Sequence, residues 1–104
     1  MKPAEMIAVL DRSLVAYGEG VTLRRGAEEV SVRACVRGYL PDELGGGVVQ
    51  GDRRLILSPT GFPFAWSPRV GDKAVVGGRV CAVMAVDLIR TADVVSRIEM
   101  RVRG

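Results

Sequence analysis

Residues 72–86 read DKAVVGGRVCAVMAV, and this stretch decides which kind of fold the chain adopts. Two valine-rich runs, Asp72 to Val76 and Arg79 to Val86, flank the pair Gly77-Gly78. Adjacent glycines accept the positive backbone angles that a tight two-residue turn between antiparallel strands requires. The stretch therefore predicts a β-hairpin.

Outward from this hairpin, apolar and polar residues alternate with a period of two through most of the chain after Gly20. The alternation predicts further strands at 21–25, 30–37, 53–58 and 96–103, the first two joined by a turn at 26–29. The last strand has a charged second face. About six antiparallel strands predict a mainly β fold, either a small antiparallel β-sandwich or a partly closed β-barrel.

Ahead of the strands, residues 3–17 show the period of a helix instead. Met6, Leu10, Leu14 and Tyr17 recur at spacings of four, four and three residues, which predicts one N-terminal amphipathic α-helix. Proline is tolerated in the first helical turn, and Gly18 is placed to end the helix. We expect this helix to cover an open end of the β structure or to lean on a neighbouring molecule.

The chain has 104 residues, of which 48% are hydrophobic and 26% charged. This length and composition predict a single folded domain spanning 1–104. Its apolar runs are far shorter than the roughly 20 residues of a membrane-spanning helix, and no secretory signal stands out. We expect a cytosolic protein with no membrane partner.

Several kinds of chemistry are excluded by residue type. Histidine is absent, which removes the usual general base and the catalytic triads that need it. Cys35 and Cys81 cannot alone hold a structural zinc; in a reducing cytosol we interpret them as packing residues, with a disulfide as the alternative. The carboxylates are scattered, and Asp72 after Gly71 is typical of a turn. We predict no enzyme activity, no cofactor and no metal.

Two long irregular stretches, 38–51 and 59–71, interrupt the strands. The first contains Gly45-Gly46-Gly47, but a phosphate-binding loop would need a following Lys-Ser/Thr and a helix, and neither is present. A loop of this length is a surface connection or a functional segment. Tyr39, Leu40 and Leu44 are candidates for exposed apolar residues that order on binding a partner.

The second stretch holds Phe62, Phe64 and Trp66 among prolines. These aromatic side chains either fold back to plug one end of the β structure or project as a second protein interface. Stacking on single-stranded bases is a third use, but it normally needs aromatics along a basic sheet face.

Arginine dominates the cations, since only Lys2 and Lys73 among the fifteen Lys and Arg residues are lysine. The net charge is +3 and the pI about 9.3. Arg33, Arg37, Arg53 and Arg54 lie on or beside predicted strands, where the ordinary role is a solvated face. In a closed ring of subunits they would instead face a channel and contact a nucleic-acid duplex without reading its sequence. The corresponding alternative function is a small β-barrel that binds nucleic acid.

The order and spacing of the strand and loop residues resemble a known family. The matching residues are Val21-Thr22-Leu23-Arg24-Arg25, Val32-Arg33-Ala34, Tyr39, Pro41-Asp42-Glu43-Leu44, Gln50-Gly51-Asp52, Leu55-Ile56-Leu57-Ser58, Val70-Gly71-Asp72-Lys73-Ala74-Val75-Val76, Gly77-Gly78-Arg79 and Met100-Arg101-Val102-Arg103-Gly104. Together they resemble the head-to-tail joining and stopper (head-completion) proteins in the necks of tailed bacteriophages.

The resemblance implies a structural virion protein, assembled in the host cytoplasm, that joins head to tail and helps retain packaged DNA. It implies a homo-oligomeric ring of six or twelve copies, with a portal or adaptor on the head side and a tail terminator or tail tube on the tail side. The N-terminal segment would contact the head side. The loop from Pro41 to Asp52 would be the joining or channel-closing loop. The candidate partner-binding residues are Tyr39, Leu40, Asp42, Glu43, Leu44, Gln50 and Asp52. A third reading, an enzyme accessory or assembly chaperone encoded by a prophage, shares the fold but would be absent from finished particles.

Overall fold

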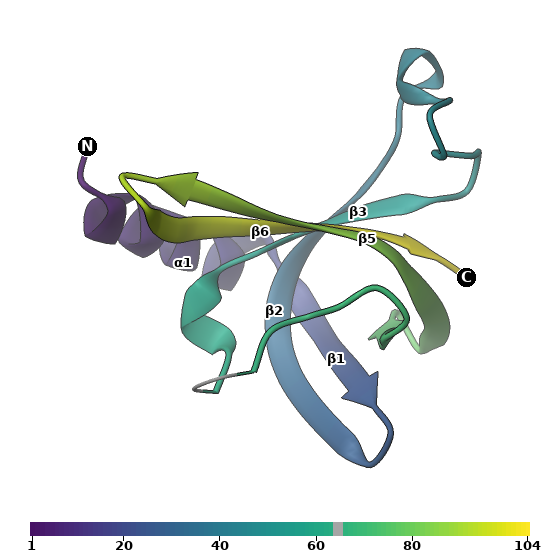
Figure 1. Ribbon diagram of the computed structural model, residues 1–104, viewed down its shortest axis with the longest axis horizontal. Coiled ribbons are helices and arrows are strands. Elements are labelled where there is room, and N and C mark those ends of the chain that lie inside the picture. The colour runs from purple at the N-terminus through teal and green to yellow at the C-terminus, as the bar shows by residue number, and fades with distance from the viewer. Residues whose placement is uncertain (64–65) are drawn as a thin grey trace.

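A computed structural model describes residues 1–63 and 66–104 (Figure 1). Over these residues the chain forms one α-helix, two short 3₁₀ helices and six strands. In chain order they are α1 (Pro3–Tyr17), β1 (Glu19–Arg25), β2 (Glu28–Gly38), η1 (Pro41–Glu43), β3 (Arg53–Leu57), η2 (Pro59–Gly61), β4 (Lys73–Val76), β5 (Arg79–Thr91) and β6 (Val94–Arg103).

The six described strands form a closed antiparallel barrel in the order β1-β2-β3-β6-β5-β4. The mainly β prediction with one N-terminal helix is confirmed. Of the two predicted architectures the barrel is the one that forms, and it is closed completely. Closure depends on β5, whose first part pairs with β4 and whose second part pairs with β6, with a register shift between Val83 and Ala85. Such a bulge bends a strand and lets it serve both neighbours.

The barrel interior is filled by the apolar residues of the predicted alternation. Leu23, Leu55, Leu57 and Met100 are its largest fully buried side chains. Cys81 also belongs to this core, so the packing interpretation is confirmed for it. Cys35 is half-buried outside the core cluster, and both cysteines are free thiols, as expected over the alternative of a disulfide.

The strands β5 and β6 are longer than the alternation predicted. β5 was expected at 79–86 but extends to Thr91, and β6 was expected at 96–103 but begins at Val94. Ala92 and Asp93 form the turn between them, with φ of 50° and 65°. Neither residue is a glycine, so the usual signal of a tight turn is missing from the sequence. The turn between β1 and β2 is likewise shorter than the expected 26–29, because β2 begins at Glu28.

The helix α1 has the predicted bounds and lies against β2, β6 and η2 (Figure 1). Of its residues, all in the described part of the chain, Leu14 alone is fully buried. Polar contacts complete the attachment: Asp11 accepts a hydrogen bond of 2.9 Å from the Thr60 hydroxyl, and Arg33 donates to the carbonyl oxygens of Leu14 and Gly18 at 3.0 and 2.6 Å. Within 1–63 and 66–104, no helix is long and apolar enough to cross a membrane.

Candidate protein-interaction site

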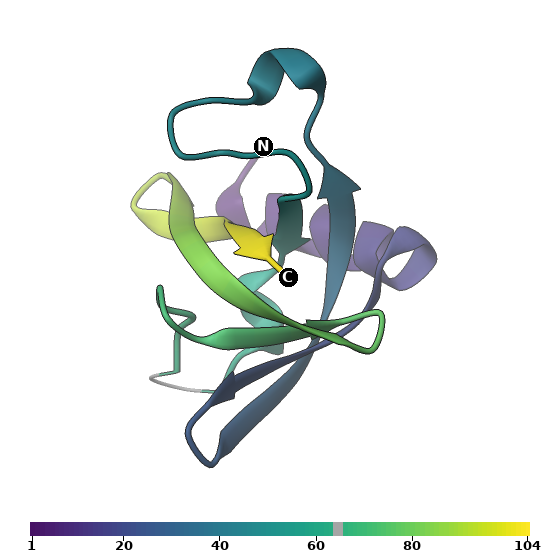
Figure 2. The same ribbon diagram turned by 90° about the vertical axis from the view of Figure 1, so that its right-hand side faces the viewer.

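The segment 39–52 leaves the end of β2 and extends beyond the barrel before the chain returns as β3 (Figures 1 and 2). We call it the neck loop, after the role that the resemblance predicts for residues 41–52. Its backbone is ordered locally by η1 and by a bridge between Gly45 and Val48. Three apolar side chains on it are exposed: Leu40 (63% exposed), Leu44 and Val49. Asp42 and Gln50 are exposed beside them.

One set of side chains holds the first half of the neck loop against β3. The guanidinium of Arg54 lies 4.9 Å from the centre of the Tyr39 ring and 3.1 Å from the Glu43 carboxylate. Glu43 also accepts a hydrogen bond of 2.8 Å from the backbone N–H of Leu40. This backbone hydrogen bond, followed by the charge of Arg54, lowers the pKa of Glu43. Cation–π and ion-pair contacts therefore fix the start of η1.

A second set holds the end of the loop through Asp52, whose residue is only 2% exposed. Arg103 on β6 donates two hydrogen bonds to its carboxylate, of 2.7 and 2.9 Å, and a third of 3.1 Å to the carbonyl of Gly47. The backbone N–H of Val49 donates to the same carboxylate, and Arg101 lies 3.5 Å away. The hydrogen bonds from Arg103 outweigh the effect of burial and lower the pKa of Asp52.

The same construction occurs a second time at Asp72, ahead of β4. Arg25 donates two hydrogen bonds of 2.8 Å to the buried Asp72 carboxylate, which also accepts one from the N–H of Arg69. Burial raises the pKa of Asp72, but the hydrogen bonds from Arg25 and Arg69 outweigh it, so the pKa is lowered. Asp52 and Asp72 each follow a glycine with positive φ, 95° at Gly51 and 97° at Gly71.

We call these two sites the Gly-Asp anchors, 51–52 and 71–72. The prediction that Asp72 closes a turn is confirmed, since its N–H donates to the Arg69 carbonyl. The buried ion pairs were not predicted. The signal available in the sequence was the repeated Gly-Asp directly before or beside a strand, although nothing local identifies which arginine joins it.

The anchors divide the predicted partner-binding residues into two groups. Asp52 was expected to contact a partner, and this expectation is wrong because its carboxylate is buried and paired. Tyr39 and Glu43 are also engaged within the chain. The side chains that remain free to meet a partner are those of Leu40, Asp42, Leu44 and Gln50, with Val49 as an addition.

The aromatic segment packs inward where it is described. Phe62 and Trp66 are half-buried against the core, with parallel rings 5.8 Å apart. Arg25 lies 4.3 Å above the Trp66 ring, and the indole N–H donates to Glu28 at 3.0 Å. This is the end-plug arrangement, so Phe62 and Trp66 stabilise the barrel instead of projecting as an interface. Phe64 lies outside the described residues.

The four arginines proposed to face a channel have different surroundings. Arg33 binds the C-terminal carbonyls of α1, and Arg54 holds the neck loop. Arg37 is exposed opposite Arg54 in the β2–β3 register. Arg53 lines a cavity of about 330 Å³ at one end of the barrel. They therefore do not form one continuous cationic surface.

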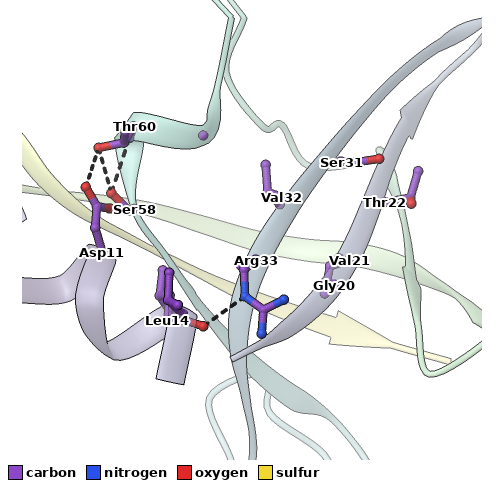
Figure 3. Close-up of a pocket in the computed structure, with 12 residues that line it drawn as sticks. Asp11, Leu14, Gly20, Val21, Thr22, Ser31, Val32, Arg33, Ser58 and Thr60 are labelled. Atoms are coloured by element: carbon purple, nitrogen blue, oxygen red, sulfur yellow. Dashed lines mark hydrogen bonds between the residues drawn. The ribbon is translucent and has the colours of Figure 1, made fainter. Parts of the chain in front are cut away.

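A second surface lies beside α1. A groove of about 760 Å³ runs between α1, the β1–β2 pair and η2 (Figure 3). Leu14 and Val15 form its helical wall, Thr22 and Ser31 lie on its strand side, and Thr60 is at the η2 end. Arg33 lies in the groove between Leu14 and Gly20 (Figure 3).

Comparison with known proteins does not assign the chain. No protein-family model matches it, and no curated protein matches it. Within residues 1–63 and 66–104, no three His, Cys, Asp or Glu side chains gather in a group that could hold a metal ion. The neck loop and the groove are therefore the features of the described residues that bear on function.

Proposed function

We propose that the protein is a structural component of the neck of a tailed bacteriophage. In this role it assembles as a ring of six or twelve copies between portal or adaptor and tail, joins the two and helps retain the packaged DNA. No bond is made or broken. The proposal starts from the ordered resemblance of the strand and loop residues, and one structural observation carries it further.

That observation is the neck loop, a projecting segment that exposes three apolar side chains beside Asp42 and Gln50, while its base is clamped by two sets of ion pairs. Exposed leucines and valines grouped on one segment are typical of a protein-binding surface. A segment already held in shape loses little conformational entropy on binding, which favours tight association. The closed barrel supplies a base in which each described strand is hydrogen-bonded to two neighbours.

The helix offers a second contact area on another side of the molecule. Val9 (43% exposed) and Tyr17 (85% exposed) leave part of its apolar surface uncovered. We assign this area to the head side of the neck. A subunit with apolar contact areas on separate sides suits a position between two larger assemblies.

The alternative of a nucleic-acid-binding barrel receives less support from the charges. The outward row Arg37, Arg54 and Arg101 across β2, β3 and β6 is accompanied by Glu43, Glu99 and Asp52. Paired arginines release few counterions on meeting a phosphate backbone. The proposal therefore keeps nonspecific contact between the ring and the packaged DNA. It does not include nucleic-acid binding as the main function of the protein.

The test uses a phage that carries this gene and a deletion strain without it. Purified protein added to DNA-filled heads and tails of the deletion strain is expected to restore joined particles, counted by electron microscopy, and to be present in them by mass spectrometry. The double substitution Leu40→Asp/Leu44→Asp is expected to abolish joining, while Val94→Asp, on an exposed valine away from the loop, leaves it intact.

Absence of the protein from finished particles would favour the chaperone reading and reject a neck role. Retention of oligonucleotide binding near physiological salt, with a slope of several charges, would favour the nucleic-acid alternative.

A further inference from the structure

The outer face of the barrel carries one cross-strand row without any charge. In register, Ser31 on β2 lies beside Thr22 on β1, Thr22 beside Val75 on β4, and Val75 beside Val80 on β5. Two residues further along β1, the neighbouring row holds Arg24 with Glu29 and Lys73. The uncharged row, which ends in the exposed Val80, therefore lies directly beside a charged row.

This row borders the groove beside α1, so the two form one surface. Thr22 and Ser31 belong to both, and the exposed Val15 forms the opposite wall. We call this combined area the α1 face. Its one exposed cation is Arg33, whose hydrogen bonds go only to the carbonyl oxygens of Leu14 and Gly18, so no carboxylate neutralises it among the described ion pairs. Asp11 lies apart at the η2 end, bound by the Thr60 hydroxyl.

The neck loop presents the complementary features. Leu40, Leu44 and Val49 are its exposed apolar side chains, and Asp42 is an exposed acid with no ion pair or side-chain hydrogen bond to any residue that the structure describes. The loop, with its apolar side chains and one unpaired acid, therefore matches the strand side of the groove, where Arg33 is the charged group and Asp11 lies apart at the η2 end. Burial of both apolar surfaces would drive association, and the Asp42–Arg33 pair would set its register.

We propose that the neck loop of one copy docks on the α1 face of a second copy of this chain. The two surfaces lie on different sides of the molecule: in Figure 2 the neck loop is at the top, and the C-terminal end of α1 lies at the right, set back from the viewer. The contact is therefore heterologous, with the loop of each copy meeting the α1 face of the next, and such contacts close into rings. The inference rests on the proposed function insofar as the ring is the assembled state of the neck protein.

A complementation experiment tests this contact. The loop variant, Leu40→Asp/Leu44→Asp, keeps an intact α1 face, and the groove variant, Val15→Asp/Val80→Asp, keeps an intact loop. We expect the wild-type chain to self-associate with rising concentration in light scattering and each variant to stay monomeric. An equimolar mixture of the two variants should give a one-to-one dimer, because one intact loop and one intact α1 face remain to pair.

Two further measurements sharpen the result. Asp42→Asn should weaken self-association about two- to fivefold, the effect of one partly exposed ion pair, while Asp93→Asn on the distant β5–β6 turn should not change it. Val70→Asp, on an exposed valine outside both surfaces, should associate like the wild type. Circular dichroism establishes that every variant is folded before it is compared.

A mixture of folded variants that remains monomeric would overturn the docking, as would a wild-type chain that stays monomeric up to its solubility limit. Either variant associating like the wild type would also overturn it. The proposed function fails separately: a ring with the predicted loop contact that joins no heads to tails would reject the neck role and keep the docking. A monomeric protein that still joins heads to tails would reject the docking and keep the neck role.

Discussion

At the scale of single residues, the same local chemistry fixes two different loops. In each Gly-Asp anchor the glycine reverses the chain at positive φ, and the aspartate then accepts hydrogen bonds from an arginine side chain and from the backbone N–H three residues earlier. A buried carboxylate is costly without partners, and here charged partners satisfy it. The anchors fix the chain at 49–52 and at 69–72, directly before β3 and β4.

The lowered pKa values of Asp52 and Asp72 predict loss of stability in acid. A carboxyl group whose pKa is lower in the folded than in the unfolded state stabilises the fold above the unfolded value, about 3.9, and this stabilisation is lost as pH falls through the folded pKa. We therefore expect the contribution of these two groups to the free energy of unfolding to be constant near neutral pH. It should fall as the pH is lowered from about 5 to about 2.

Substitution of the anchors tests their part in that loss. Asp52→Asn and Asp72→Asn should each lower the free energy of unfolding at pH 7 by about 1–3 kcal/mol, with solvent screening at the partly exposed arginines limiting the effect. Each variant should also lose less stability in acid than the wild type. Urea titrations across this pH range measure both quantities, and Asp87→Asn serves as an exposed control. Acid profiles parallel to that of the wild type would show that the anchors do not carry the pH dependence.

Gly18 is a second residue on which local structure depends. A methyl group there would lie 2.5 Å from the carbonyl oxygen of Leu14 and 3.1 Å from that of Ala34, and both are fixed backbone atoms. Gly18→Ala should lower the free energy of unfolding by about 1–3 kcal/mol. The matched control is Gly20→Ala, where nothing lies within 4 Å of the added atom. Equal urea midpoints for the two variants would contradict the prediction.

At the scale of elements, the β5–β6 hairpin is long although its turn contains no glycine. The two strands continue past the barrel body to Thr91 and Val94, yet their turn uses Ala92 and Asp93 at positive φ. Non-glycine residues in this conformation store backbone strain. The pairing of the two long strands holds the turn in place.

Relief of that strain gives a prediction for the hairpin. Ala92→Asn/Asp93→Gly places the preferred pair for a type I′ turn at these positions and should raise the free energy of unfolding by about 1 kcal/mol. Ala92→Val, a β-branched residue at the same angle, should lower it. Urea midpoints at constant slope make the comparison, and the same sign of change in both variants would contradict it.

At the scale of the whole molecule, the barrel and α1 are two unequal parts. The barrel is continuous in hydrogen bonding around its six described strands, whereas the helix is attached through Leu14, Arg33 and the Asp11–Thr60 contact. Regions with few buried apolar side chains open at lower free energy than the core. The helix is thus the part best suited to change its packing on assembly.

This division predicts independent opening of the helix. Leu14→Ala should weaken the docking of α1 by about 2–4 kcal/mol and speed hydrogen exchange of the α1 amides, while amides of β1–β6 keep their protection. Val15→Ala, on the exposed neighbour, should change neither. Loss of protection throughout the barrel in Leu14→Ala would show that helix and barrel unfold as one unit.

The sequence by itself determined the elements that depend on near neighbours. The bounds of α1, the Gly77-Gly78 hairpin, the alternating core residues and the free state of both cysteines all follow from periodicity, turn propensity and composition. Tertiary structure alone decided which strands meet, that β5 bends to close the barrel, and that the long β5–β6 ribbon exists without a glycine turn.

The buried ion pairs show the physical reason for this difference. Arg25 and Asp72 are 47 residues apart, and Arg103 and Asp52 are 51 apart. A period or a turn propensity reports on residues within a few positions, whereas the partner of a buried charge is set by closure of the whole barrel. The same closure buried Asp52 and left Leu40, Asp42 and Leu44 on the surface, so it selected which loop residues can meet another chain.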